Sequence, residues 1–181
     1  QVHFQIWCGN SDEVRDKLER GLADVGIVRA PGYMEQCEQI FLRSEPWVAA
    51  MSRTHPLAGE ESIRFEQLEP YPCLAFEQGD DSSFYLAEEI LSTNEYPRII
   101  RANDRATMLN LMVGLKGYTL CSGIICEELN GNEFVAVPFQ DDEENRNSTM
   151  EIGYIVRKNM IPSRMGELYI TELRKTLGTG Q

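Results

Sequence analysis

The chain has 181 residues, of which 42% are hydrophobic and 25% are charged, and this average composition excludes wholesale disorder and collagen-like structure. No apolar run approaches the roughly 18–20 residues that a membrane-spanning helix needs. The formal net charge is −12, so this chain by itself should bind nucleic acid poorly, because its surface repels phosphate.

The first 29 residues follow the pattern strand, helix, strand. Apolar and polar residues alternate over 2–6, which predicts a strand. Asn10 can cap the helix that follows, with Glu13 three residues later as in a capping box, and Gly21 ends that helix. The apolar run at 23–28 predicts a buried strand. Two strands joined by a helix form a βαβ unit, which implies a parallel sheet.

The rest of the chain also alternates strands with helices, so the predicted fold class is α/β. A short helical turn is expected at 65–68, and the acidic run at 141–144 predicts a solvated loop. Further strands are predicted at 38–43, 47–51, 72–76, 99–102, 117–121, 134–137 and 150–156. Further helices are predicted at 82–92, 104–115 and 124–129, and from Pro162 to about residue 177.

The length accommodates one domain or two small lobes, and two places are candidate passages between lobes. Pro46 interrupts two consecutive strands, and the strand at 150–156 follows the acidic loop. If both are hinges, lobe one is residues 1–45 plus 151–181, and lobe two is residues 46–150. Two such lobes place a cleft at the carboxyl ends of their strands, which is an arrangement for clamping a ligand.

The start of the chain and its cysteines bear on where the protein works. The chain begins at Gln1 in a strand pattern without a basic and apolar leader, so we expect a fragment or a processed product and no signal peptide. The cysteine count is odd and the spacing is irregular, which favours free thiols in a reducing, cytoplasmic compartment over a disulfide framework. The cysteines are Cys8, Cys37, Cys73, Cys121 and Cys126.

Several short motifs occur in a familiar order. Gly-Asn-Ser at 9–11, a helix ending in Gly, and Ala-Asp-Val-Gly-Ile at 23–27 resemble the signature of LysR-type transcriptional regulators. His-Pro-Leu at 55–57 resembles that family's H-P-L motif. The segment 104–120 resembles its helix–Gly–strand segment, with Gly114 and Gly117 at the two glycine positions. The resemblance runs from residue 2 to about residue 177 and covers the effector-binding part of the family.

The resemblance implies two Rossmann-like lobes joined by two crossover strands, similar to the type 2 periplasmic-binding-protein fold. The first strand and helix of lobe one would be absent from this chain, as would the winged helix-turn-helix. A small-molecule effector would bind in the inter-lobe cleft and alter the geometry of a homodimer or homotetramer, with the helix at 10–21 among the interface elements. DNA would be a partner only through the missing domain. No catalytic activity, cofactor, metal or membrane partner is implied.

The positions of seven residues in the sequence, together with the family resemblance, predict that they bind the effector. They are Asn10, Ser11, Arg29, Gln78, Ser82, Ser83 and Phe84. Arg29 ends a strand at the presumed cleft edge, where its guanidinium could bind a carboxylate in a forked geometry, although a surface ion pair is the alternative. Asn10 and Ser11 lie where strand meets helix, and helix capping alone would explain them.

The segment 82–84 begins a helix after a glycine-bearing loop that contains Gln78. Free N–H groups at a helix start suit an anion, but capping by Asp81 or Ser82 explains the same pattern without a ligand. The acids Asp80 and Asp81 repel a carboxylate and favour an amine or a neutral group. The charge of the effector is therefore open, and an organic acid or an amino-acid-like metabolite remains in question.

The same residues bear on three other functions. A free-standing solute-binding protein of a transporter would share the fold, although the cysteines and the H-P-L motif fit it less well. An enzyme would need a constellation such as G-x-S-x-G, a P-loop or G-x-G-x-x-G, and the sequence contains none. The spacing of Cys121 and Cys126 matches no usual zinc pattern. The segment from residue 77, where peroxide-sensing members of the family carry reactive cysteines, contains no cysteine at 77–83. Core packing therefore explains Cys121 and Cys126 better, as it does for Met108 and Met112.

Overall fold

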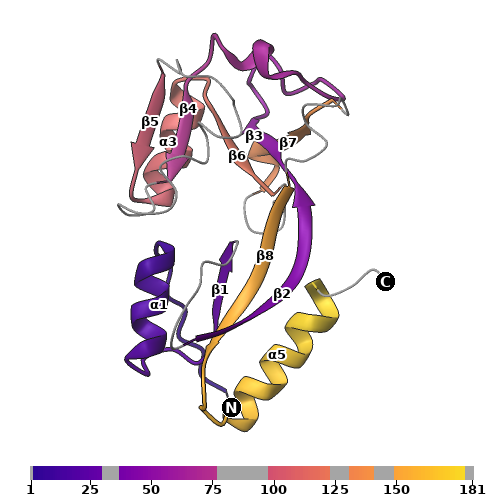
Figure 1. The fold of residues 1–181 in the computed structure, drawn as a ribbon. Helices are drawn as coiled ribbons and strands as arrows, with labels where there is room; N and C mark the ends of the chain where they lie inside the picture. The colour runs from indigo at the N-terminus through magenta and orange to yellow at the C-terminus, as the bar shows by residue number, and fades with distance from the viewer. Residues whose placement is uncertain (1, 30–36, 77–97, 123–130, 141–148, 178–181) are drawn as a thin grey trace. The chain divides into compact units, whose positions relative to one another are not determined.

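The computed structural model describes residues 2–29, 37–76, 98–122, 131–140 and 149–177 (Figure 1). The chain forms two compact units: unit 1 is drawn from residues 1–44 and 151–181, and unit 2 from residues 45–150. The chain passes from one unit to the other twice, within β2 (Cys37–Pro46) and within β8 (Thr149–Arg157). Within the described residues no helix is long and apolar enough to cross a membrane.

Unit 1 contains a three-stranded sheet in the order β1-β8-β2. Its β1 (Gly26–Arg29) pairs antiparallel with β8, so that Gly26 lies opposite Ile155. The helix α1 (Ser11–Glu19) packs on this sheet, where fully buried Leu18 contributes to a core with Val28, Cys37 and Ile155. The apolar face that the sequence gives to this helix is therefore the face that it buries.

The capping box predicted for α1 is confirmed. Asn10 Oδ1 accepts a hydrogen bond from the Glu13 backbone N–H at 2.8 Å, and Glu13 Oε2 accepts one from the Asn10 backbone N–H at 2.9 Å. The helix ends at Arg20, and Gly21 takes a φ of 69°, a left-handed conformation that glycine adopts without steric cost. Both ends of α1 thus form where the sequence predicts them.

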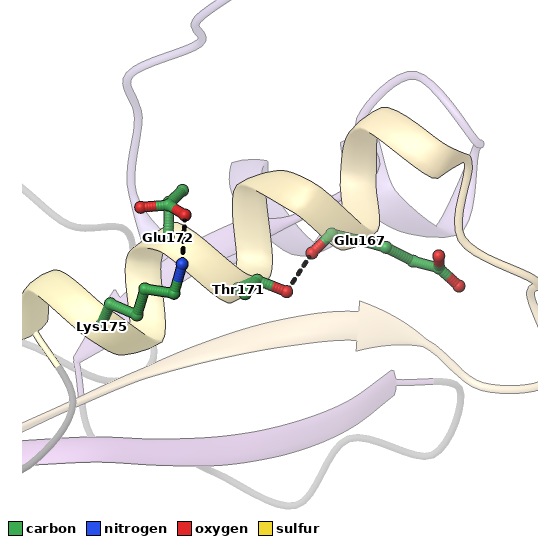
Figure 2. Close-up of polar contacts among 4 residues, drawn as sticks. All are labelled: Glu167, Thr171, Glu172 and Lys175. Atoms are coloured by element: carbon green, nitrogen blue, oxygen red, sulfur yellow. Dashed lines mark hydrogen bonds and ion pairs between the residues drawn. The ribbon is translucent and has the colours of Figure 1, made fainter.

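The helix α5 (Arg164–Leu177) also belongs to unit 1. Arg174 joins it to β8, because its guanidinium donates a hydrogen bond to the hydroxyl of buried Tyr154 and lies over the Tyr154 ring, 5.5 Å from its centroid. Exposed polar groups of α5 bond to one another along the helix, as Figure 2 shows. Thr171 Oγ1 donates to the Glu167 carbonyl at 2.8 Å, and Lys175 pairs with Glu172 at 2.7 Å.

Two predictions for the start of the chain are wrong. Residues 2–10 form neither helix nor strand, although 2–6 alternate as a strand would. The parallel sheet expected from the first βαβ unit is not formed either, because β1 pairs antiparallel with β8. Periodicity shows which face of a segment is apolar, but a strand exists only with a hydrogen-bonded neighbour, and the pattern does not say which segment that is.

Unit 2 contains a five-stranded sheet in the order β5-β4-β6-β3-β7. Here β4 is parallel to β5 and β6, whereas β3 is antiparallel to β6 and β7. The five strands are β3 (Val48–Ser52), β4 (Cys73–Phe76), β5 (Ile99–Ala102), β6 (Tyr118–Cys121) and β7 (Phe134–Pro138). Each overlaps a strand predicted above, as do β2 and β8 in the segments where the chain passes between the units.

Three helical segments complete the described part of unit 2: η1 (Phe65–Leu68), α3 (Arg105–Gly114) and η2 (Gly131–Glu133). Met108 and Met112 of α3 are buried against Leu74 and Ala102 of the sheet. The prediction that these methionines belong to the core is confirmed. The predicted helices at 82–92 and 124–129 and the acidic loop at 141–144 lie outside the described residues.

The turn from α3 into β6 contains the two glycines of the segment that resembles the family. Gly117 packs closely on its surroundings, since a Cβ there would lie 2.8 Å from the Pro72 carbonyl oxygen. The left-handed residue that ends the helix is Lys116, with a φ of 50°, and Gly114 lies inside the helix with open space around it. The conformation that favours glycine therefore falls on Lys116, between the two glycines.

Candidate functional site

The parallel strands of unit 2 define an edge at which ligands commonly bind. Phe76 of β4 lies opposite Ala102 of β5, so both strands end at the same edge, and the parallel β6 also ends there at Cys121. In open α/β sheets the crevice outside the carboxyl ends of parallel strands is the usual ligand site. Exposed Asn103 and partly buried Ser122 directly follow two of these strands.

Asp104 caps α3 beside this edge. Its Oδ2 accepts a hydrogen bond from the Thr107 backbone N–H at 2.7 Å. Hydrogen bonds from the Thr107 side chain and backbone lower the pKa of the Asp104 carboxyl, so the cap is a carboxylate. The start of α3 already holds a negative charge of its own and is a poor place for an anionic ligand.

Three predicted site residues lie at one edge of unit 1. α1 and β1 pack together and are joined by residues 20–25 alone, so they run in opposite directions. The start of α1, with Asn10 and Ser11, therefore lies at the same edge as the end of β1, where Arg29 pairs with Ile152 of β8. Asn10 is partly buried and occupied by the capping box, which accounts for its position without a ligand.

A hollow of about 420 Å³ opens beside the first two turns of α1. Trp7 and Lys17 line it, and the Lys17 ammonium lies 3.9 Å from the centroid of the Trp7 ring, as in a cation–π contact. Asp12 also lines it and pairs with Arg15 at 2.8 Å. The hollow thus offers an aromatic wall, and charged groups on its lining are engaged with neighbours in the same unit.

The other four predicted site residues lie outside the described residues. They are Gln78, Ser82, Ser83 and Phe84, in the segment that follows β4. The strand that precedes this segment, β4, ends at Phe76 on the carboxyl edge of the unit 2 sheet. The effector-binding role of all seven residues stays a prediction.

The histidine of the H-P-L motif fixes a turn. His55 is 4% exposed, its Nδ1 accepts a hydrogen bond from the Leu57 backbone N–H at 3.1 Å, and its ring meets the Tyr71 ring edge-on at 4.3 Å. Burial lowers the pKa of His55, and the nearby backbone of Lys116 opposes that effect in part. A buried neutral imidazole that bonds within its own turn is a structural group.

The cysteines that the structure describes are not joined in disulfides. Cys37 and Cys73 are buried, Cys121 is partly buried and Cys8 is exposed, while Cys126 lies outside the described residues. Burial and the nearby Glu19 carboxylate raise the pKa of Cys37, which disfavours the reactive thiolate. Among the described side chains no group of three or more His, Cys, Asp or Glu is arranged to hold a metal ion.

Comparison with known proteins identifies the family. Residues 1–178 match the model of the family described as LysR substrate binding domain. The chain belongs to this family. Two curated relatives of this chain are described as transcriptional regulators. HTH-type transcriptional regulator CysL of Bacillus subtilis is 27% identical to it over 95 residues. Hca operon transcriptional activator HcaR of Escherichia coli is 39% identical to it over 54 residues.

These matches are partial in both directions. The CysL match covers 52% of this chain and 31% of that protein, and the HcaR match covers 30% and 18%. The matched region of this chain therefore spans less than a third of the length of either relative.

Solved structures confirm the predicted fold. This chain superposes on the effector-binding domain of QuiR in complex with shikimate with a TM-score of 0.68 and 18% sequence identity. The match covers 94% of this chain and 81% of the QuiR chain. For the BenM effector-binding domain with benzoate the TM-score is 0.63 and the identity 21%, with coverage of 93% and 73%. For a putative LysR-family regulator from Pseudomonas aeruginosa the TM-score is 0.70 and the identity 16%, with coverage of 94% of this chain and 59% of that one. The fold is thus the periplasmic-binding-protein-like type 2 fold.

Asn103 and Ser122, at the carboxyl edge of the unit 2 sheet, were not among the predicted effector-binding residues. Each directly follows a parallel strand, at the edge where ligands commonly bind in open α/β sheets. In the sequence each is a polar residue directly after a predicted strand.

Proposed function

We propose that this chain is the effector-sensing domain of a LysR-type transcriptional regulator, in which a small organic acid or an amino-acid-like metabolite binds between the two units. One observation carries the proposal: the family model spans residues 1–178, nearly the whole chain. The relatives described as transcriptional regulators support it and favour it over a free-standing solute-binding protein or an enzyme.

The effector would bridge two strand edges. Unit 1 would contribute Asn10, Ser11 and Arg29, and unit 2 would contribute the segment after β4 together with Asn103 and Ser122. A ligand that touches both edges binds one arrangement of the units better than others and shifts the population toward it. Only that difference in affinity is needed to couple binding to a change elsewhere in the regulator.

An organic carboxylate is the effector class that the proposal favours. Arg29 would supply a guanidinium at the unit 1 edge, and a guanidinium binds a carboxylate with two parallel hydrogen bonds. Benzoate and shikimate, which occupy two domains of the same fold, are both carboxylates. The acids Asp80 and Asp81 near the predicted contacts keep an amino acid as the alternative, because its amino group would pair with them.

The whole regulator would work as a cytoplasmic homodimer or homotetramer. α1, with its largely charged outer surface, would be among the interface elements. The net charge of −12 leaves DNA contact to a different part of the protein. Catalysis has no place in this mechanism, since binding alone does the work.

A ligand screen tests the proposal. Benzoate, shikimate and a panel of amino acids are titrated into the protein by calorimetry, and we expect at least one carboxylate to bind with 1:1 stoichiometry. Failure of every organic acid and amino acid would contradict the proposed effector class. Ligand turnover during the titration would favour an enzyme instead.

Arg29→Ala tests the predicted anchor. Loss of a hydrogen bond to a charged group costs about 1.5–3 kcal/mol, so the affinity for the carboxylate should fall roughly 10- to 150-fold. Arg20→Ala is the matched control, because exposed Arg20 pairs with Asp16 at 3.1 Å on the outside of α1 and should leave binding unchanged. Equal affinities for Arg29→Ala and the unmodified protein would remove Arg29 from the site.

A further inference from the structure

We draw no further inference here: the strongest candidate, the exposed apolar surface of unit 1 where Phe4 meets Tyr169 beside Met165 and Leu168 of α5, carries none because nothing in the structure shows what covers it.

Discussion

At the scale of single residues, His55 makes the stability of unit 2 depend on pH. Its imidazole is buried and neutral, and protonation would replace the acceptor that Leu57 uses with a donor. Because burial lowers its pKa, the unfolded chain binds the proton more readily than the folded chain. The stability that neutral His55 contributes is therefore present above its unfolded pKa of about 6.5 and is lost as the pH falls below that value.

Urea denaturation at pH 7.5 and pH 5.5 measures this effect. We expect the free energy of unfolding to decrease toward the lower pH, and to decrease less in His55→Gln, which cannot take up that proton. Carboxylates titrate equally in both proteins, so the difference between the two slopes isolates the histidine. Identical slopes would show that His55 does not titrate between the folded and unfolded states.

Lys116 is strained where its helix ends. Its left-handed φ of 50° costs a residue with a Cβ about 1–2 kcal/mol, and glycine adopts that conformation freely. Gly117 N–H bonds to the Met112 carbonyl at 2.9 Å and Lys116 N–H to the Val113 carbonyl at 3.4 Å, the pattern that normally has glycine at this position. We expect Lys116→Gly to stabilise the protein by about 0.5–1 kcal/mol, since the relief exceeds the added freedom of the unfolded chain.

Thermal or urea unfolding of Lys116→Gly checks this expectation. Lys116→Ala is the matched control, because it removes the same side chain but keeps a Cβ, and its stability should remain near that of the unmodified protein. If both variants lost stability equally, the lysine side chain and not its backbone would matter at this turn.

At the scale of elements, the capping box of α1 separates helix stability from ligand contact. Asn10→Ala leaves the Glu13 backbone N–H without its acceptor and should cost about 1 kcal/mol of unfolding free energy. Asn10→Asp keeps the acceptor and should keep the stability. If Asn10 also contacts a carboxylate effector, the aspartate variant should bind it more weakly at unchanged stability. Equal stability of the two variants would show that the cap contributes little.

How much could be predicted differs between elements for physical reasons. The signals for α1 are local, since Asn10, Glu13 and Gly21 act within a few residues of one another, and the helix forms as predicted. The partner of β1 depends on β8, more than a hundred residues away, and periodicity carries no information on that choice. For the candidate site, the sequence placed Arg29 at a strand end and the structure places it at the end of β1, while its effector-binding role stays a prediction.

At the scale of the whole molecule, two connections join the two units. β2 and β8 each contribute residues to both units, so the chain passes between them twice and the units are covalently tied at two places. A ligand alters their arrangement only if it binds one arrangement better than another, and in the proposed function that preference comes from contact with both units. The proposed function therefore requires that one effector molecule contact both.

Hydrogen–deuterium exchange with and without the bound carboxylate tests that requirement most directly. Amide protection is followed in peptides that contain residues 9–14 and 26–29 of unit 1, and residues 77–84 and 102–107 of unit 2. We expect the ligand to slow exchange in both sets together, and Arg29→Ala to abolish the effect at the same ligand concentration. Protection confined to one unit would contradict a site between the units and, with it, the proposed mechanism of sensing.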